Sequence, residues 1–513
     1  MTRRPAPDLY LPGVALIAAL AGFGWLQYLA YVHAGMVFQY PLDDPYIHMA
    51  IAEQMRAGGY GVNDGEYAAA ASSVLFPVLL LPFAGEAAQR FMPLFWNIVG
   101  LGLAAYFWGR ILWLSGYAGR LSGLFLAILG PIALNMAGLA FTGMEHALHL
   151  AASLAILLGL IHFLQGGQIP TILMAGILLA PLLRFEGLAL ALVAAGVVAL
   201  RGRVGAGVGL AALAVGPVLV FALFLMSLGL DPMPSSISAK LATAPEYGGG
   251  IQGWGLSKLS RLAERPQQIL AAFLVTAAAL YLVPAVRASN RVWLLGVVLL
   301  AGGAHLIFAQ FGWMDRYEIY ILVTAAAGTL ATTQASQNLF VRLLPVAAIG
   351  FAASFYLPTV VRLYPWRPFF IELQQAQMAR FAKEVLKEPV AVNDIGLVAW
   401  RNPNYVLDLW GLASHRARAL RLDDPQPFWP DALTKEQGVK FAMVFEDWFE
   451  KGLGEDWQLL GRLRLPVGDR YLGGSVEFYL TDPTDPGRYI ALLQEWQAGL
   501  PDGATFEFAE GTL

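Results

Sequence analysis

Twelve apolar stretches constrain the fold of this chain more than any other feature of its sequence. The first runs from Leu9 to about His33. It exceeds the ~7–15-residue apolar core of a signal peptide, so we expect an uncleaved anchor. The other eleven lie at about 72–84, 91–114, 120–139, 143–164, 169–183, 187–200, 206–229, 267–286, 291–311, 316–334 and 340–361. The chain is 57% hydrophobic and 13% charged, whereas soluble proteins carry about 25% charged residues. The sequence therefore predicts a polytopic α-helical membrane protein in contact with the lipid bilayer.

The stretch at 72–84 is the weakest of the twelve. At ~1.5 Å per residue it spans only ~20 Å of a ~30 Å hydrocarbon core, and it contains Pro77 and Pro82. If it does not cross, the basic loop residues share the cytoplasmic side with the basic N-terminus, as the positive-inside rule requires. These residues are Arg110, Arg120, Arg201, Arg203, Arg287, Arg291 and Arg342. We therefore predict about eleven transmembrane helices, with 72–84 re-entrant or lying at the interface.

From about residue 365 the charge rises and the apolar runs shorten to the length of strands. An amphipathic helix is expected over 366–387, followed by strands alternating with helical pieces, which indicates a small α/β domain. Strand candidates are Pro389–Asn393, Tyr405–Leu409, Phe441–Phe445 and Ser475–Leu480, with a turn at 394–396 and a short helix at 396–401. The predicted domains are a membrane domain over 1–364, with an external loop at 35–72, and a periplasmic α/β domain over 365–513.

The external loop contains two adjacent carboxylates and a histidine, Asp43, Asp44 and His48. Asp44 precedes Pro45 in the pattern of a helix N-cap followed by Pro at the first helical position, so Asp44 is either a cap or a reacting group. Asp43 is either a solvated loop carboxylate or a general base that accepts a proton from an acceptor hydroxyl. His48 lies four residues after Asp44, on the same helical face, and would contact a phosphate, a divalent cation or the membrane interface.

Other ionisable residues interrupt apolar segments on the same predicted side of the membrane. A charge in lipid costs about 2.5–3.5 kcal/mol on insertion scales and is by default a functional hypothesis. For Arg184 the alternatives are a structural ion pair with Glu145 or Glu186 and a polar vestibule in the outer leaflet. Arg316 is either an interfacial anchor or a ligand of an anion. The remaining candidates are Tyr317 and Lys240, the latter a surface-loop lysine by default.

Carboxylates for proton transfer and cations for an anionic group, gathered at an outer membrane surface, suit transfer from a lipid-linked phosphate sugar. The rival functions are a transporter or lipid-linked-sugar flippase, which should show inverted repeats, and a non-catalytic envelope scaffold, whose charged groups need not converge. The chain has no Cys, which excludes disulfides and thiolate catalysis, and a net charge of −3 with no basic stretch, which argues against nucleic acid as a partner.

The external loop resembles that of bacterial GT-C glycosyltransferases of the arabinofuranosyltransferase-like group. The resemblance lies in Leu42–His48, Ala57–Gly61, Asn63, Gly65-Glu66 and Ala71–Pro77. Further matches follow in order along the chain, although Phe185 replaces the proline of the RPEG element, Ser235-Ser236 replace the Asn-Thr of the PNTxxAK element, and Ala71–Pro77 departs from TSPLW. They are Thr142–Glu145 (SGxE), Arg184–Gly187 (RPEG), Pro234–Lys240 (PNTxxAK), Arg316-Tyr317 (RY), Asp394–Gly396 (DxG) and Asp408–Leu412 (DLxGL).

The resemblance implies a GT-C-like fold and an enzyme in the bacterial inner membrane. This enzyme would move a sugar from a polyprenyl-phosphate donor to a glycan or lipid acceptor of the cell envelope, on the periplasmic side. It implies Asp43 or Asp44 as the base, and a divalent cation (Mg, Mn or Ca) in some members, for which Asp44 and His48 are the candidate ligands. The expected substrate-binding residues are His48, Glu145, Arg184, Glu186, Lys240, Arg316 and Tyr317.

Overall fold

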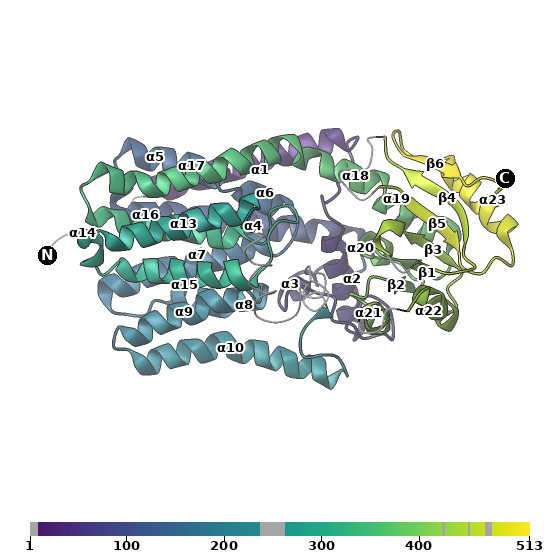
Figure 1. The fold of residues 1–513 in the computed structure, drawn as a ribbon, viewed down its shortest axis with the longest axis horizontal. Coiled ribbons are helices and arrows are strands. Elements are labelled where there is room, and N and C mark those ends of the chain that lie inside the picture. The colour runs from purple at the N-terminus through teal and green to yellow at the C-terminus, as the bar shows by residue number, and fades with distance from the viewer. Residues whose placement is uncertain (1–8, 236–261, 423–425, 450–451, 467–473, 513) are drawn as a thin grey trace.

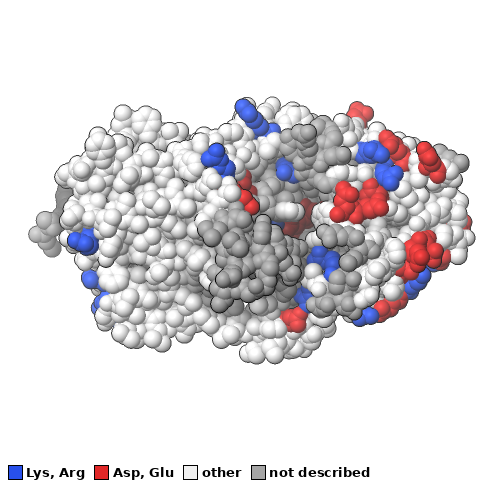
Figure 2. Space-filling view, in the orientation of Figure 1, with Lys and Arg blue, Asp and Glu red and all other residues white. Residues whose placement is uncertain are grey.

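Figure 1 shows an elongated molecule in which a bundle of long helices carries a smaller α/β domain at one end. The computed structural model describes residues 9–235, 262–422, 426–449, 452–466 and 474–512. Charged side chains gather over the half of the molecule that contains the α/β domain, and the visible face of the bundle is almost free of them (Figure 2). This separation of charge is expected when one part of a chain contacts lipid and the other contacts water.

The bundle is built from helices rich in Leu, Ala, Val and Gly, many of them apolar on all sides. Such a helix either packs against others or contacts lipid. Helix α10 (Val204–Ser227) illustrates the second case, because Leu219, Val220 and Leu223 are exposed along it. The helices are α1 (Tyr10–His33), α4 (Met92–Leu112), α5 (Leu121–Ala133), α6 (Met136–Phe141), α7 (His146–Gly166), α8 (Thr171–Leu183), α9 (Gly187–Leu200), α10 (Val204–Ser227), α13 (Arg265–Leu282), α14 (Pro284–Arg287), α15 (Val292–Phe308), α16 (Ile319–Thr332) and α17 (Leu339–Arg362).

Six helical stretches among the described residues are long and apolar enough to cross a membrane. They are Tyr10–His33, Ala87–Tyr117, Leu121–Phe141, His146–Gly166, Val204–Ser227 and Leu339–Leu386. Shorter apolar helices occupy Thr171–Leu183, Gly187–Leu200, Val292–Phe308 and Ile319–Ala335. The number of eleven crossings stays a prediction. The stretch 72–84 forms only the short helix α3 (Phe76–Leu79), which at ~1.5 Å per residue is far too short to cross.

The external loop folds around helix α2 (Asp44–Ala57), which ends at Gly58 in a left-handed conformation. The predicted N-cap is displaced by one residue. Asp43 occupies the N-cap position, Asp44 is the first helical residue, and no side chain forms a capping hydrogen bond to this helix. The carboxylates of Asp43 and Asp44 are thereby left for other partners.

The α/β domain contains one mixed sheet of six strands in the order β2-β1-β3-β5-β4-β6. Strand β1 is parallel to β2 and β3, and the remaining pairs are antiparallel. The strands are β1 (Val390–Val392), β2 (Val406–Asp408), β3 (Phe441–Val444), β4 (Gln458–Arg464), β5 (Val476–Leu480) and β6 (Thr505–Phe508). The helices are α20 (Gly396–Ala399), α21 (His415–Leu422), α22 (Trp429–Gln437) and α23 (Pro486–Gln497). All four predicted strands are present, and β4 and β6 were not predicted.

The single helix predicted over 366–387 is wrong. The segment is divided into α18 (Arg367–Leu373), α19 (Gln375–Arg380) and a π-helical turn over 381–386. The break falls at Gln374, with φ −120° and ψ −80°. The buried Gln374 side chain donates from Nε2 to the carbonyl of Gly474 at 3.0 Å, so this residue ties the connecting segment to the sheet.

One hydrophobic core is shared by the external loop and the α/β domain. It joins Tyr46 and Met49 of α2 to Val390 and Val392 of β1 and to Leu397 of α20. The opposite face of the sheet has a separate core under α21 and α22, and the helical bundle has a third. The loop and the domain therefore form one packed layer above the end of the bundle.

Candidate functional site

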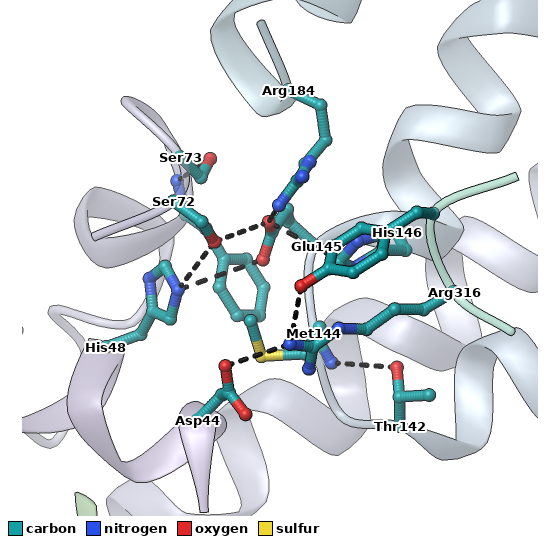
Figure 3. A network of polar contacts seen from close by, with 12 residues as sticks. Asp44, His48, Ser72, Ser73, Thr142, Met144, Glu145, His146, Arg184 and Arg316 are labelled. Carbon is teal, nitrogen blue, oxygen red and sulfur yellow. Dashed lines mark hydrogen bonds and ion pairs between the residues drawn. The ribbon is translucent and has the colours of Figure 1, made fainter. Parts of the chain in front are cut away.

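Helix α2 directs Asp44 and His48 toward the end of the helical bundle (Figure 3). The two residues are four apart and occupy one helical face, as predicted. The Asp44 carboxylate accepts a hydrogen bond from Nη2 of Arg316, with Oδ1 2.9 Å away. The Asp44 side chain is 31% exposed and that of Arg316 is 2% exposed. The pair therefore has one partly open member and one buried member.

Arg316 has more donors than the described partners use. Its Nη2 also lies 3.1 Å from the hydroxyl of Tyr317. Its Nε and Nη1 are buried and have no hydrogen-bond partner among the described residues. A buried donor left unpaired costs about 1–3 kcal/mol, and more when charged. The two nitrogen atoms are therefore the strongest local indication that an acceptor from outside the described chain binds here.

Arg184 lies at the break between α8 and α9 and is clamped by two glutamates. Its Nη2 and Nε donate to Oε1 and Oε2 of Glu186 at 2.7 and 3.2 Å. Its Nη1 donates to Oε1 of Glu145 at 3.0 Å. The guanidinium also lies over the ring of Tyr317, 5.3 Å from its centroid. This is the ion-pair alternative considered for Arg184. All three nitrogen atoms of its guanidinium group donate charge-assisted hydrogen bonds to the two glutamates.

Glu145 is held in place by the tight turn before α7. Gly143 has a φ of +75°, which favours glycine. A β-carbon at this position would collide with the ring of Tyr40. Glu145 itself is fully buried. The glycine of the Thr142–Glu145 motif is thus explained by the close approach of the external loop, which brings Glu145 under α2.

Ser72 joins His48 to Glu145, and the predicted site omitted it. The Ser72 hydroxyl donates to Oε1 of Glu145 at 2.9 Å and lies 3.3 Å from Nε2 of His48. Because its one proton points to Glu145, we assign the His48 proton to Nε2. Burial lowers the pKa of His48, which favours the neutral ring. Its Nδ1 is then an acceptor, and among the described residues Nδ1 has no hydrogen-bond partner. The only sequence signal for Ser72 was its place in Ala71–Pro77.

Asp43 does not face this cluster. Its carboxylate accepts hydrogen bonds from the backbone amides of Gly396, and of Leu397 at 2.8 Å, at the start of α20. Asp43 is 5% exposed. The geometry thus separates two carboxylates that are adjacent in sequence, and Asp44 rather than Asp43 is the one that meets Arg316. The role of base predicted for Asp43 stays a prediction from the sequence.

The remaining predictions concern Lys240 and a metal. Lys240 lies outside the described residues. In the described part of the chain, no group of three or more His, Asp or Glu side chains is arranged to hold a metal ion. Asp44 already accepts from Arg316, and Nε2 of His48 faces Ser72 and Glu145. A bound divalent cation with Asp44 and His48 as its ligands stays a prediction from the sequence.

The similarities to known proteins include a family model and a solved structure. Residues 368–479 match a family model described as a domain of unknown function, DUF8728. No curated protein matches the sequence. The crystal structure of an oligosaccharyltransferase from Archaeoglobus fulgidus in its apo form is similar over 93% of this chain and 75% of that chain, with 11% sequence identity and a TM-score of 0.46.

Proposed function

We propose that this protein is an inner-membrane glycosyltransferase that moves a sugar from a polyprenyl-phosphate donor to a cell-envelope glycan or lipid on the periplasmic side. The ordered series of motifs similar to GT-C enzymes supports this class. The observation that carries the proposal is the Asp44–Arg316 pair, in which a partly exposed carboxylate contacts a buried guanidinium that has two unused donors.

Each member of the pair has a separate task in the proposed reaction. Arg316 binds an oxygen of the donor phosphate through Nε and Nη1, which stabilises the negative charge that grows as the phosphate departs. Asp44 accepts the proton of the acceptor hydroxyl. The O–H bond of the acceptor and the bond from the anomeric carbon to the phosphate oxygen break. A bond from the acceptor oxygen to the anomeric carbon forms, and polyprenyl phosphate leaves with the electron pair.

Arg184, Glu145 and Glu186 shape the site in this proposal rather than bind the phosphate. Arg184 is already paired with both glutamates. Through Ser72 the same network sets the orientation of His48, whose Nδ1 then accepts a hydrogen bond from a sugar hydroxyl. The ring of Tyr317 contacts both guanidinium groups, which lie 5.3 and 5.1 Å from its centroid.

The balance of charge favours a further cation. The described cluster contains three carboxylates, Asp44, Glu145 and Glu186, against the guanidinium groups of Arg184 and Arg316. An anionic donor would bind poorly to an acidic cluster. We therefore propose that Lys240, which was predicted from the sequence, is an additional ligand of the phosphate.

A transfer assay with the purified protein in detergent tests the function. It offers a panel of radiolabelled polyprenyl-phosphate sugars with a membrane glycan extract as acceptor, and it compares the wild type with Asp44→Asn. The matched control is Asp64→Asn, the same change at an exposed position of the same loop. We expect label to reach glycan in the wild type and in D64N. In D44N the rate should fall by about 10²–10⁴-fold, the usual contribution of a general base.

Full transfer by a well-folded D44N would contradict the role of Asp44. Absence of transfer from every donor would contradict the proposed reaction, and reconstitution into liposomes would then test the transporter or flippase alternative. In that assay, movement of a labelled lipid-linked sugar across the bilayer without release of its sugar would favour transport.

A further inference from the structure

Asp43 forms a joint between the external loop and the α/β domain. Its two carboxylate oxygens accept hydrogen bonds from the successive backbone amides of Gly396 and Leu397. These residues are separated from Asp43 by more than 350 positions in the sequence, so the joint exists only in the folded chain. Hydrogen bonds to an ionised acceptor are about twice as strong as neutral ones, and this carboxylate has two of them.

A second carboxyl group completes the joint. The side chain of Asp394 is hydrogen-bonded to that of Asp43, and its Oδ2 accepts from Nε2 of Gln375 at 2.9 Å. Two adjacent carboxylates cannot both stay ionised at low dielectric. Asp394 therefore carries the proton and donates it toward Asp43, which remains the acceptor for three donors. The polar surroundings of the pair also include Asp44 and Lys383.

Gly396 is packed closely against Asp43, with no space for a side chain. A β-carbon on Gly396 would lie 2.7 Å from Oδ2 and 2.8 Å from Cγ of Asp43, and it would collide with the carbonyl oxygen of Asp43. That carbonyl also accepts from the amide of Tyr46 at 3.1 Å, in the first turn of α2. The glycine of the Asp394–Gly396 motif is thus explained by contact with the start of α2, and any shift of α20 would move this turn.

We propose, on the basis of the function proposed above, that Asp43 is a positioning residue: its bonds to Asp394, Gly396 and Leu397 hold the start of α2 so that Asp44 meets Arg316. Asp43 and Asp44 are consecutive, and their carboxylates point to the α/β domain and to the bundle, respectively. The α/β domain is then a structural part of the transfer site.

Spin-label distance measurements test the positioning without any need for activity. The chain has no cysteine, so the double variant A57C/L200C can be labelled at the exposed end of α2 and at an exposed position on α9. The full chain in detergent would be measured in this background. We expect one narrow distance distribution in the otherwise unchanged protein, and a broader or shifted one in Asp43→Asn and Gly396→Ala.

Two further variants separate positioning from a general loss of folding. In Asp394→Asn the side-chain amide replaces the protonated carboxyl as the donor to Asp43. The distance distribution should therefore match that of the wild type, and the transfer rate should stay within about twofold of the wild-type rate. Gly487→Ala is the matched glycine control, because a β-carbon there would have open space. Asp394→Ala removes the hydrogen bonds of this side chain to Asp43 and Gln375 but leaves the bonds from the amides of Gly396 and Leu397 to Asp43. It serves if D43N does not fold, and it should broaden the distribution to a smaller extent.

Kinetics distinguish the outcomes. In D43N and G396A we expect kcat to fall at least tenfold, whereas D394N and G487A keep it. Unchanged distance distributions in D43N and G396A would overturn the positioning role, as would a D394N variant that behaves like D43N. If the distributions broaden but the wild type transfers no sugar from any donor, the joint stands and the proposed transferase function fails.

Discussion

Arg316 combines a full set of donors with very little exposed surface. One of its nitrogen atoms is shared by Asp44 and Tyr317, and two more face no described acceptor. A lysine would keep the positive charge but could not present several donors in one plane. The shape of the guanidinium group, and not only its charge, should therefore matter for binding the donor.

Arg316→Lys tests this requirement. Loss of one or two charge-assisted hydrogen bonds, at about 1.5–3 kcal/mol together, lowers kcat/KM for the lipid-linked donor by roughly 10- to 100-fold. The measurement is initial transfer rate against donor concentration. Arg203→Lys, at an exposed position between α9 and α10, is the control. Equal kcat/KM in R316K and the wild type would show that charge alone suffices.

The Asp43–Asp394 pair should make stability depend on pH. Burial raises the pKa of both residues, and Asp394 is raised further because it faces the charge of Asp43. The folded chain therefore holds a proton that the unfolded chain releases above about pH 4. Because the folded state then binds more protons than the unfolded state, the free energy of unfolding falls as the pH rises above that value. D394N, which holds no titrating proton, should show a smaller decrease in Tm between pH 5 and pH 8; an unchanged slope would contradict the shared proton.

At the scale of single elements, the turn before α16 is the most strained part of the site. Trp313, Met314 and Asp315 have φ values of 51°, 61° and 51°, a left-handed conformation that costs roughly 1–2 kcal/mol per residue. Glu318 holds the turn by accepting from the amide of Gly312 at 2.9 Å and from the hydroxyl of Tyr356 at 3.2 Å. This turn places Arg316 within hydrogen-bond distance of Asp44.

Removal of the Glu318 carboxylate should release this turn. We expect Glu318→Ala to lower the free energy of unfolding by about 2 kcal/mol, as two buried hydrogen bonds are lost, and to reduce transfer because Arg316 moves. Glu318→Gln keeps an acceptor for the amide of Gly312 and a donor for the hydroxyl of Tyr356. It should therefore retain most of the stability and most of the transfer activity. Thermal denaturation and transfer rates of the two variants check this, and an E318A variant as stable and active as E318Q would exclude the role.

The elements with a strong local signal could be predicted from sequence. Four strands were placed correctly, as were the short helix near residue 396 and the failure of 72–84 to form a long helix. Arg184 and Arg316 were found because a charge inside an apolar stretch is conspicuous. The different directions of Asp43 and Asp44 could not be found, since the partners of Asp43 are over 350 residues away. Ser72 gave little signal because a serine is unremarkable until its neighbours are known.

At the scale of the whole molecule, the external loop and the α/β domain behave as one folded unit. Besides Asp43, the loop residue Asn63 pairs with both backbone groups of Val406 on β2, each at 2.9 Å. Trp400 is buried between the two parts, where its Nε1 donates to Gln89 at 2.9 Å and its ring lies 5.6 Å from that of Tyr46. Local opening should therefore involve both parts together.

Hydrogen exchange of Trp400→Ala tests this coupling. Loss of a buried Trp side chain costs about 3–5 kcal/mol. We expect amides of α2 and of α20 to exchange faster by similar factors, because the cavity lies in the core that they share. Trp457→Ala is the matched control, since Trp457 packs on the opposite face of the sheet; it should accelerate exchange in α22 and leave α2 unchanged. If W400A accelerated α20 alone, the loop would be held by the bundle, and the α/β domain would have no part in placing Asp44.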